Sequence, residues 1–214
     1  MVTTPDLIDE LCASLTPVRR LRPPLLRAGI WLLLTASIVV LLAAFQGVRP
    51  GLALLLQSPA FTVALAGSLL TGALAVVAAF ELSLPDRSRL WLLLPAPALV
   101  LWLSTIGYGC LTDWVSLGPD GIRLGSTLEC FATLLLVSLP AAAALALMLR
   151  PTAWLDPTPV AVSGGLAVGG IAASAMTLLH DLDATVMVLA WTLGATVLIA
   201  TLGGLLGRRI FGPL

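Results

Sequence analysis

The sequence predicts an all-α, polytopic membrane protein, in which a bundle of six transmembrane helices follows a short cytoplasmic N-terminal amphipathic helix. Apolar residues make up 59% of the 214-residue chain and charged residues only 10%, a balance that is not typical of soluble domains. Six apolar stretches follow a polar tail. Each is near the roughly 20 helical residues that a hydrocarbon core about 30 Å thick requires.

These stretches divide the chain into three parts. Residues 1–27 form a cytoplasmic tail, residues 28–207 the transmembrane domain and residues 208–214 a cytoplasmic C-terminus. The six expected spans are 28–45, 60–80, 91–107, 128–149, 159–179 and 186–206. Pro95 and Pro97 are expected to kink the third span or to shift its start, and Pro140 to bend the fourth.

The arginines predict the orientation in the membrane. Nine of the eleven lie in the tail, the second loop, the fourth loop and the C-terminus, which share one side of the expected bundle. Only Arg49 and Arg123 lie on the opposite side. Because short loops rich in arginine stay in the cytoplasm, both termini are expected to face the cytoplasm.

The expected spans are nearly free of ionisable residues, which argues against a proton-coupled transporter. Glu81, Glu129 and His180 all fall near span ends, far from the midplane where transport routes carry such groups. The chain also has no Walker loop, His-Glu-x-x-His or Gly-x-Ser-x-Gly motif. We therefore expect no enzymatic activity, no cofactor and no metal site, while a small transporter or channel remains an alternative.

Small residues on the fifth span predict close helix packing. Small-xxx-small spacing lets two backbones approach closely within a membrane. The favoured interpretation is a tight contact inside one subunit, and the alternative is a homodimer face. The residues concerned are Ser163, Gly164, Gly165, Gly169, Gly170, Ala173 and Ser174, with Gly203 and Gly207 repeating the spacing in the sixth span.

The tail contains a short amphipathic helix. Thr4 is a suitable N-cap and Pro5 suits the first helical position, while Pro17 ends the helix. Because so short a helix is marginal alone in water, its leucine face is expected to bind a groove on a partner. Two alternatives are a helix lying on the inner leaflet and one packed under its own bundle. The apolar face consists of Leu7, Ile8, Leu11 and Leu15, opposite Asp6, Asp9 and Glu10.

The tail and the six spans together resemble the NrsF-like (negative regulator of sigma F) integral-membrane anti-sigma factors. The similarity lies in Leu7-Ile8-x-x-Leu11 and in Thr16-Pro17-Val18-Arg19-Arg20-Leu21. It extends to Gly109-Cys110, Asp113-Trp114, Leu117-Gly118-Pro119, Cys130, Leu179-His180, Trp191 and Gly194.

The resemblance implies an anti-sigma factor in the bacterial inner membrane, with a sigma factor and the bilayer as partners and no nucleic acid. An extracytoplasmic-function (ECF) sigma factor would be sequestered by the tail and released on an envelope signal. The implied sigma-binding residues are Leu7, Ile8, Leu11, Leu15, Pro17, Val18, Arg19 and Leu21.

The cysteines add a hypothesis about the opposite side of the membrane. Cys110 and Cys130 flank the expected periplasmic third loop, where a disulfide would persist; the alternative is two independent buried thiols. A thiol-redox membrane protein is a third functional alternative, although no Cys-x-x-Cys pair supports it. Cys110, Cys130, His180 and Asp181 are the candidate signal-sensing residues. In the resembling family a cysteine commonly follows this histidine, and here that residue is Asp181.

Overall fold

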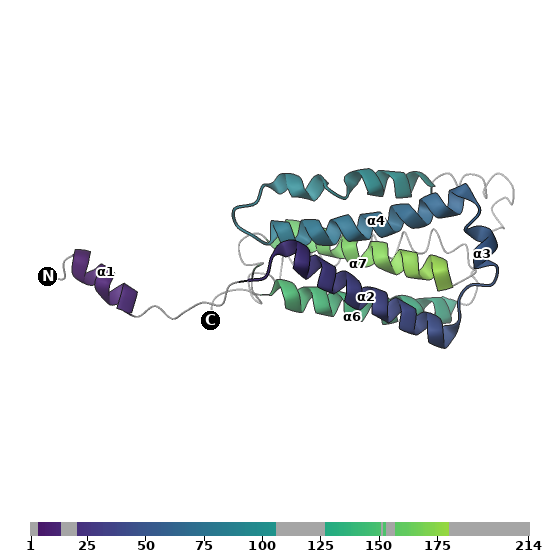
Figure 1. Cartoon of the computed structure of the whole chain (residues 1–214), viewed down its shortest axis with the longest axis horizontal. Coiled ribbons are helices and arrows are strands. Elements are labelled where there is room, and N and C mark those ends of the chain that lie inside the picture. The colour runs from purple at the N-terminus through teal and green to yellow at the C-terminus, as the bar shows by residue number, and fades with distance from the viewer. Residues whose placement is uncertain (1–3, 14–20, 106–126, 151, 153–156, 180–214) are drawn as a thin grey trace.

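A computed structural model describes residues 4–13, 21–105, 127–150, 152 and 157–179 (Figure 1). Within them the chain is helical and has no strand. The elements are α1 (Thr4–Ala13), α2 (Pro24–Gln46), α3 (Leu52–Leu55), α4 (Pro59–Leu82), the 3₁₀ helix η1 (Arg89–Leu93), α6 (Thr127–Leu149) and α7 (Pro157–Leu179). A further helix, over residues 96–105, follows η1 after a two-residue break.

Four of these helices are long and apolar enough to cross a membrane, namely α2, α4, α6 and α7. With 23 or 24 residues each, they reach about 35 Å at 1.5 Å per residue, more than a bilayer core requires. The described residues thus confirm the expected helical fold, and four of the expected spans have the length and composition of membrane spans. The expected sixth span, residues 186–206, lies outside the described residues.

The third expected span is interrupted near its start. The apolar segment Arg89–Thr105 begins as the 3₁₀ helix η1, and the α-helix starts only after Pro95. The Leu99 N–H donates to the Pro95 carbonyl at 2.9 Å, in the first turn of the restarted helix. Proline has no N–H and clashes with the preceding turn, so the predicted shift in the helix start is confirmed.

The helices α2 and α7 run in one direction and α4 and α6 in the other, so the bundle has two distinct ends (Figure 1). We call the end that contains the starts of α2 and α7 and the last turns of α4 and α6 the tail end, because α1 lies beyond it (Figure 1). The opposite end is the far end. Arg49 lies there, and its backbone N–H donates to the Leu178 carbonyl at 3.1 Å. The other described arginines are at the tail end: Arg22, Arg27, Arg87, Arg89 and Arg150.

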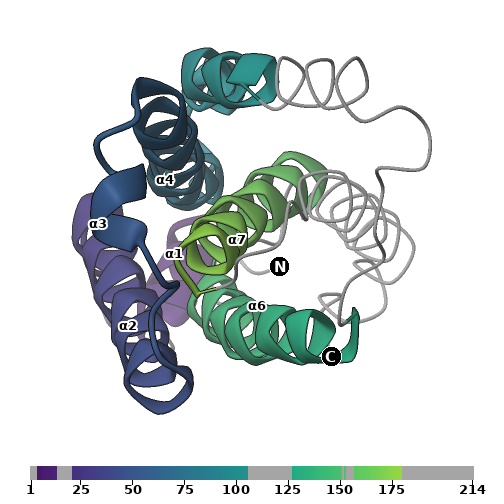
Figure 2. The same cartoon turned by 90° about the vertical axis from the view of Figure 1, so that its right-hand side faces the viewer.

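The helix α7 lies between α4 and α6, and small residues form its contact with α4 (Figure 2). A Cβ added to Gly170 would lie 2.8 Å from the Gly72 backbone nitrogen. One turn away, the hydroxyls of Ser68 and Ser174 are 2.8 Å apart and share a buried hydrogen bond. The small residues of α7 thus serve a contact within the chain, as the favoured interpretation predicted.

Candidate partner-binding tail and its attachment to the bundle

The tail helix α1 stands apart from the bundle (Figure 1). Its ten residues include Leu7, Ile8 and Leu11 of the predicted apolar face. The Ile8 side chain is 53% exposed, and Asp9 and Cys12 are exposed as well. An exposed isoleucine on a short isolated helix is apolar area that a partner could cover.

The rest of the predicted sigma-binding segment is only partly described. Leu21 is exposed, directly before the prolines that begin α2. Leu15, Pro17, Val18 and Arg19 lie outside the described residues. Their proposed contacts with a partner therefore remain predictions from the sequence.

The bundle begins four residues earlier than the apolar pattern predicts. We expected the first span to start at Ala28, whereas α2 starts at Pro24, with Pro23 as its N-cap. Proline suits the first helical position because that residue needs no N–H donor and its φ is already helical. The Arg27 N–H donates to the Pro23 carbonyl at 3.1 Å, which closes the first turn.

Arg27 thus lies inside α2 and is 5% exposed. Its guanidinium donates a hydrogen bond to the backbone carbonyl of Met148 in the last turn of α6. The guanidinium carbon is also 4.6 Å from the centre of the Phe80 ring, in the last turn of α4. Sequence reasoning treated Arg27 only as a cytoplasmic charge and missed these contacts.

A second side chain fixes the start of α2 one turn further along. The indole N–H of Trp31 donates to the Ala141 carbonyl of α6 at 2.9 Å, and the whole side chain is buried. Arg27 and Trp31 are four residues apart and therefore lie on the same face of the helix. The start of α2 is thus bonded to α6 at two successive turns.

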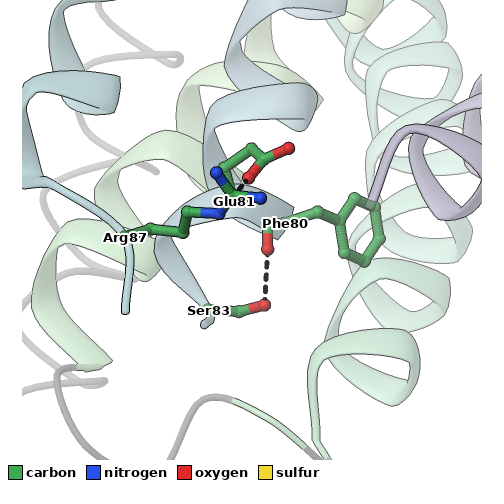
Figure 3. A network of polar contacts seen from close by, with 4 residues as sticks. All are labelled: Phe80, Glu81, Ser83 and Arg87. Carbon is green, nitrogen blue, oxygen red and sulfur yellow. Dashed lines mark hydrogen bonds and ion pairs between the residues drawn. The ribbon is translucent and has the colours of Figure 1, made fainter. Parts of the chain in front are cut away.

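The end of α4 carries an ion pair (Figure 3). Nε of Arg87 lies 3.1 Å from Oε2 of Glu81, although the two atoms are not aligned for a hydrogen bond. The Ser83 hydroxyl donates to the Phe80 carbonyl at 2.7 Å, while the Phe80 ring points towards α2. Because the Arg87 side chain is 43% exposed, this pair contributes at most about 1 kcal/mol.

The candidate signal-sensing residues are largely outside the described part of the chain. Cys110, His180 and Asp181 are not among the described residues. Cys130 lies in the first turns of α6, and therefore at the far end of the bundle. The disulfide between Cys110 and Cys130 remains a prediction.

In the described residues these features define a class of protein: a helical bundle with four helices apolar enough to span a membrane and an N-terminal helix that is exposed outside the bundle. The chain belongs to the NrsF family, described as negative regulator of sigma F, whose profile matches residues 11–212. Searches of curated proteins and of solved structures found no significant match. The match covers nearly the whole chain, so the expected family is confirmed, and with it a role as a negative regulator whose partner is a sigma factor.

Proposed function

We propose that this protein is a membrane-bound anti-sigma factor that sequesters an ECF sigma factor through α1 and releases it on an envelope signal. The observation that carries the proposal is the exposed helix α1 on a chain of the NrsF family. A short helix gains order by laying its apolar face in a partner groove. The bound sigma factor would be held at the membrane and kept from core polymerase.

The chemistry of α1 supports a protein partner over a lipid partner. By helical spacing, Asp6, Asp9 and Glu10 fall opposite the leucine face, and none of the ten residues of α1 is basic. Helices that lie on an anionic leaflet carry lysine and arginine on their polar face instead. The acidic face would repel anionic headgroups, which leaves a protein groove as the better site for the leucine face.

The proposal is tested by capture of the partner. The full-length protein, purified in detergent micelles, is immobilised and exposed to each purified ECF sigma factor of the source organism. We expect one of them to bind with micromolar or tighter affinity, which corresponds to about 8 kcal/mol or more. Capture of none of them would contradict the proposed function.

The proposed topology gives a separate prediction. Single cysteines at Arg89, Asp120 and Leu214 would be introduced into a variant whose three native cysteines are serine. An impermeant maleimide added outside spheroplasts is expected to label only the variant with cysteine at Asp120, because the arginines favour a cytoplasmic tail end. Labelling of the variants with cysteine at Arg89 or Leu214 instead would show that the protein has the opposite orientation.

A third prediction concerns the two cysteines expected on the periplasmic side. If their disulfide only holds the third loop, it stabilises the protein by about 3 kcal/mol for a loop of roughly 20 residues. Cys110→Ser and Cys130→Ser should then lower the midpoint of thermal unfolding, while repression of the sigma regulon persists. The measurements are thermal unfolding in micelles and a reporter for the regulon. Constitutive induction by either variant at normal abundance would make the thiols the switch.

A further inference from the structure

A buried arginine joins the tail to the bundle at the junction of three helices. Arg27 is the fourth residue of α2, and its guanidinium reaches the last turns of both α4 and α6. Within the described spans, Glu81 at the end of α4 is the other charged side chain that the structure shows to be buried. A cation buried at this level of a membrane protein is costly unless its surroundings compensate it.

The hydrogen bond to Met148 replaces one that α6 cannot make for itself. In a continuing helix the Met148 carbonyl would accept from Thr152, but the Thr152 N–H donates to the Leu149 carbonyl instead. Pro151 has no N–H to offer. Arg27 therefore satisfies an acceptor at the end of α6 that the helix leaves open.

The contact with Phe80 of α4 also compensates the buried charge of Arg27. The Phe80 ring is fully buried, and its face accepts the guanidinium at a distance typical of a cation–π contact. The last turns of α4 and α6 also present the negative ends of their helix dipoles, which favour a cation. All three interactions depend on the last turns of α4 and α6 both lying against the start of α2, which packs on each of them.

The described end of the tail, Leu21 and Arg22, joins this contact through a stiff pair of prolines. Pro23 and Pro24 have fixed φ angles, and the Arg27 N–H is bonded to the Pro23 carbonyl. A change in the direction of the first turn of α2 is therefore passed to Leu21 and Arg22, where the tail joins. In the structure α1 lies away from the bundle with Ile8 exposed, so this residue of the predicted apolar face is open to a partner.

We propose that Arg27 is a latch that couples the packing of α4 and α6 against the start of α2 to the presentation of the tail. The inference rests on the proposed function. While Arg27 holds both helix ends, α1 is presented to the sigma factor. When the last turns of α4 and α6 move away from the start of α2, Arg27 loses the Phe80 ring and the Met148 carbonyl together. The first turn of α2 is then released, and the tail is withdrawn from the position that binds the sigma factor.

The test uses Arg27→Gln and Phe80→Leu in the full-length protein. Arg27→Gln removes the guanidinium from both contacts, Phe80→Leu removes only the contact with α4, and neither changes α1. In cells without stress we expect the sigma reporter to rise roughly five-fold or more at unchanged protein abundance, the size of a modest coupling between sites. The dissociation constant of the sigma factor in micelles should rise by the same factor. The double variant should match the stronger single one, because both act through one contact.

Arg22→Gln is the matched control, since it removes an exposed arginine from the same segment. It should leave the reporter and the dissociation constant as in wild type. An equal effect of Arg22→Gln would overturn the latch, because it would reduce Arg27 to a general cytoplasmic charge. If Arg27→Gln lowers the abundance of the protein, the reporter and the dissociation constant of Phe80→Leu decide whether the latch exists.

The latch and the proposed function fail differently. Unchanged sigma affinity and reporter in Phe80→Leu and Arg27→Gln would overturn the latch alone, because wild type would still bind the sigma factor. Failure of wild type to capture any ECF sigma factor would overturn both. A lower unfolding temperature with unchanged affinity would make Arg27 a structural residue only.

Discussion

Replacing Leu11 by glutamate is expected to abolish binding of the sigma factor while membrane insertion and abundance stay normal. Leu11 is one turn after Leu7 and lies at the centre of the predicted apolar face of α1. A carboxylate buried there without a partner costs several kcal/mol, against about 8 kcal/mol for a micromolar complex. The dissociation constant should therefore rise by at least about 100-fold. Ile8→Glu should act in the same way, because Ile8 is an exposed member of this face.

The matched control is Ala13→Glu. Ala13 is exposed at the end of the same helix and, by helical spacing, lies on the acidic face with Asp6 and Asp9. The substitution adds the same charge to α1 but leaves the leucine face intact, so the affinity should change less than about three-fold, within 1 kcal/mol. The affinities are measured with the full-length protein in micelles and the regulon is followed with a reporter. Wild-type repression by Leu11→Glu would show that another part of the chain inhibits the sigma factor.

The sequence was most informative where one physical rule acts alone. The lengths of the apolar runs identified α2, α4, α6 and α7, because the thickness of the bilayer core fixes how many residues a span needs. Small-residue spacing predicted the contact of α7, although it could not say that α4 was the partner. A periodic pattern shows which face packs, but only the structure shows what lies against it.

The sequence was less informative at the tail end, where polar and apolar rules compete. A charged residue normally marks the outside of a span, so Arg27 was assigned to the tail and the first span was expected from Ala28. The structure instead buries Arg27 inside α2, because Phe80 and the Met148 carbonyl compensate its charge. Both partners come from segments more than 50 residues away in the chain, which no local pattern reveals. The only local sign that Arg27 could belong to the first span was its spacing, one helical turn before Trp31.

Gly170→Ala is expected to destabilise the bundle, although alanine is the better helix former. A Cβ at this position would lie 2.8 Å from the Gly72 nitrogen and 2.9 Å from the Ser68 carbonyl oxygen. Both atoms belong to the backbone of α4, so α4 and α7 would have to separate and would stretch the bond between Ser68 and Ser174. Overpacking of this kind costs about 1–3 kcal/mol. Alanine recovers up to about 1 kcal/mol of helix propensity, so the net effect is destabilising.

Gly29→Ala makes the same chemical change in the second turn of α2 and serves as the control. No heavy atom would lie within 4 Å of its new Cβ, other than the helix's own backbone and chain neighbours, so only the gain in helix propensity remains. The midpoint of thermal unfolding in micelles should therefore fall for Gly170→Ala and hold or rise for Gly29→Ala. Separated helices would also disturb α6 and the latch around Arg27, because α7 packs against both α4 and α6. Gly170→Ala should consequently weaken repression as well as stability. A midpoint at or above that of wild type would mean that α4 and α7 are not held in this close contact.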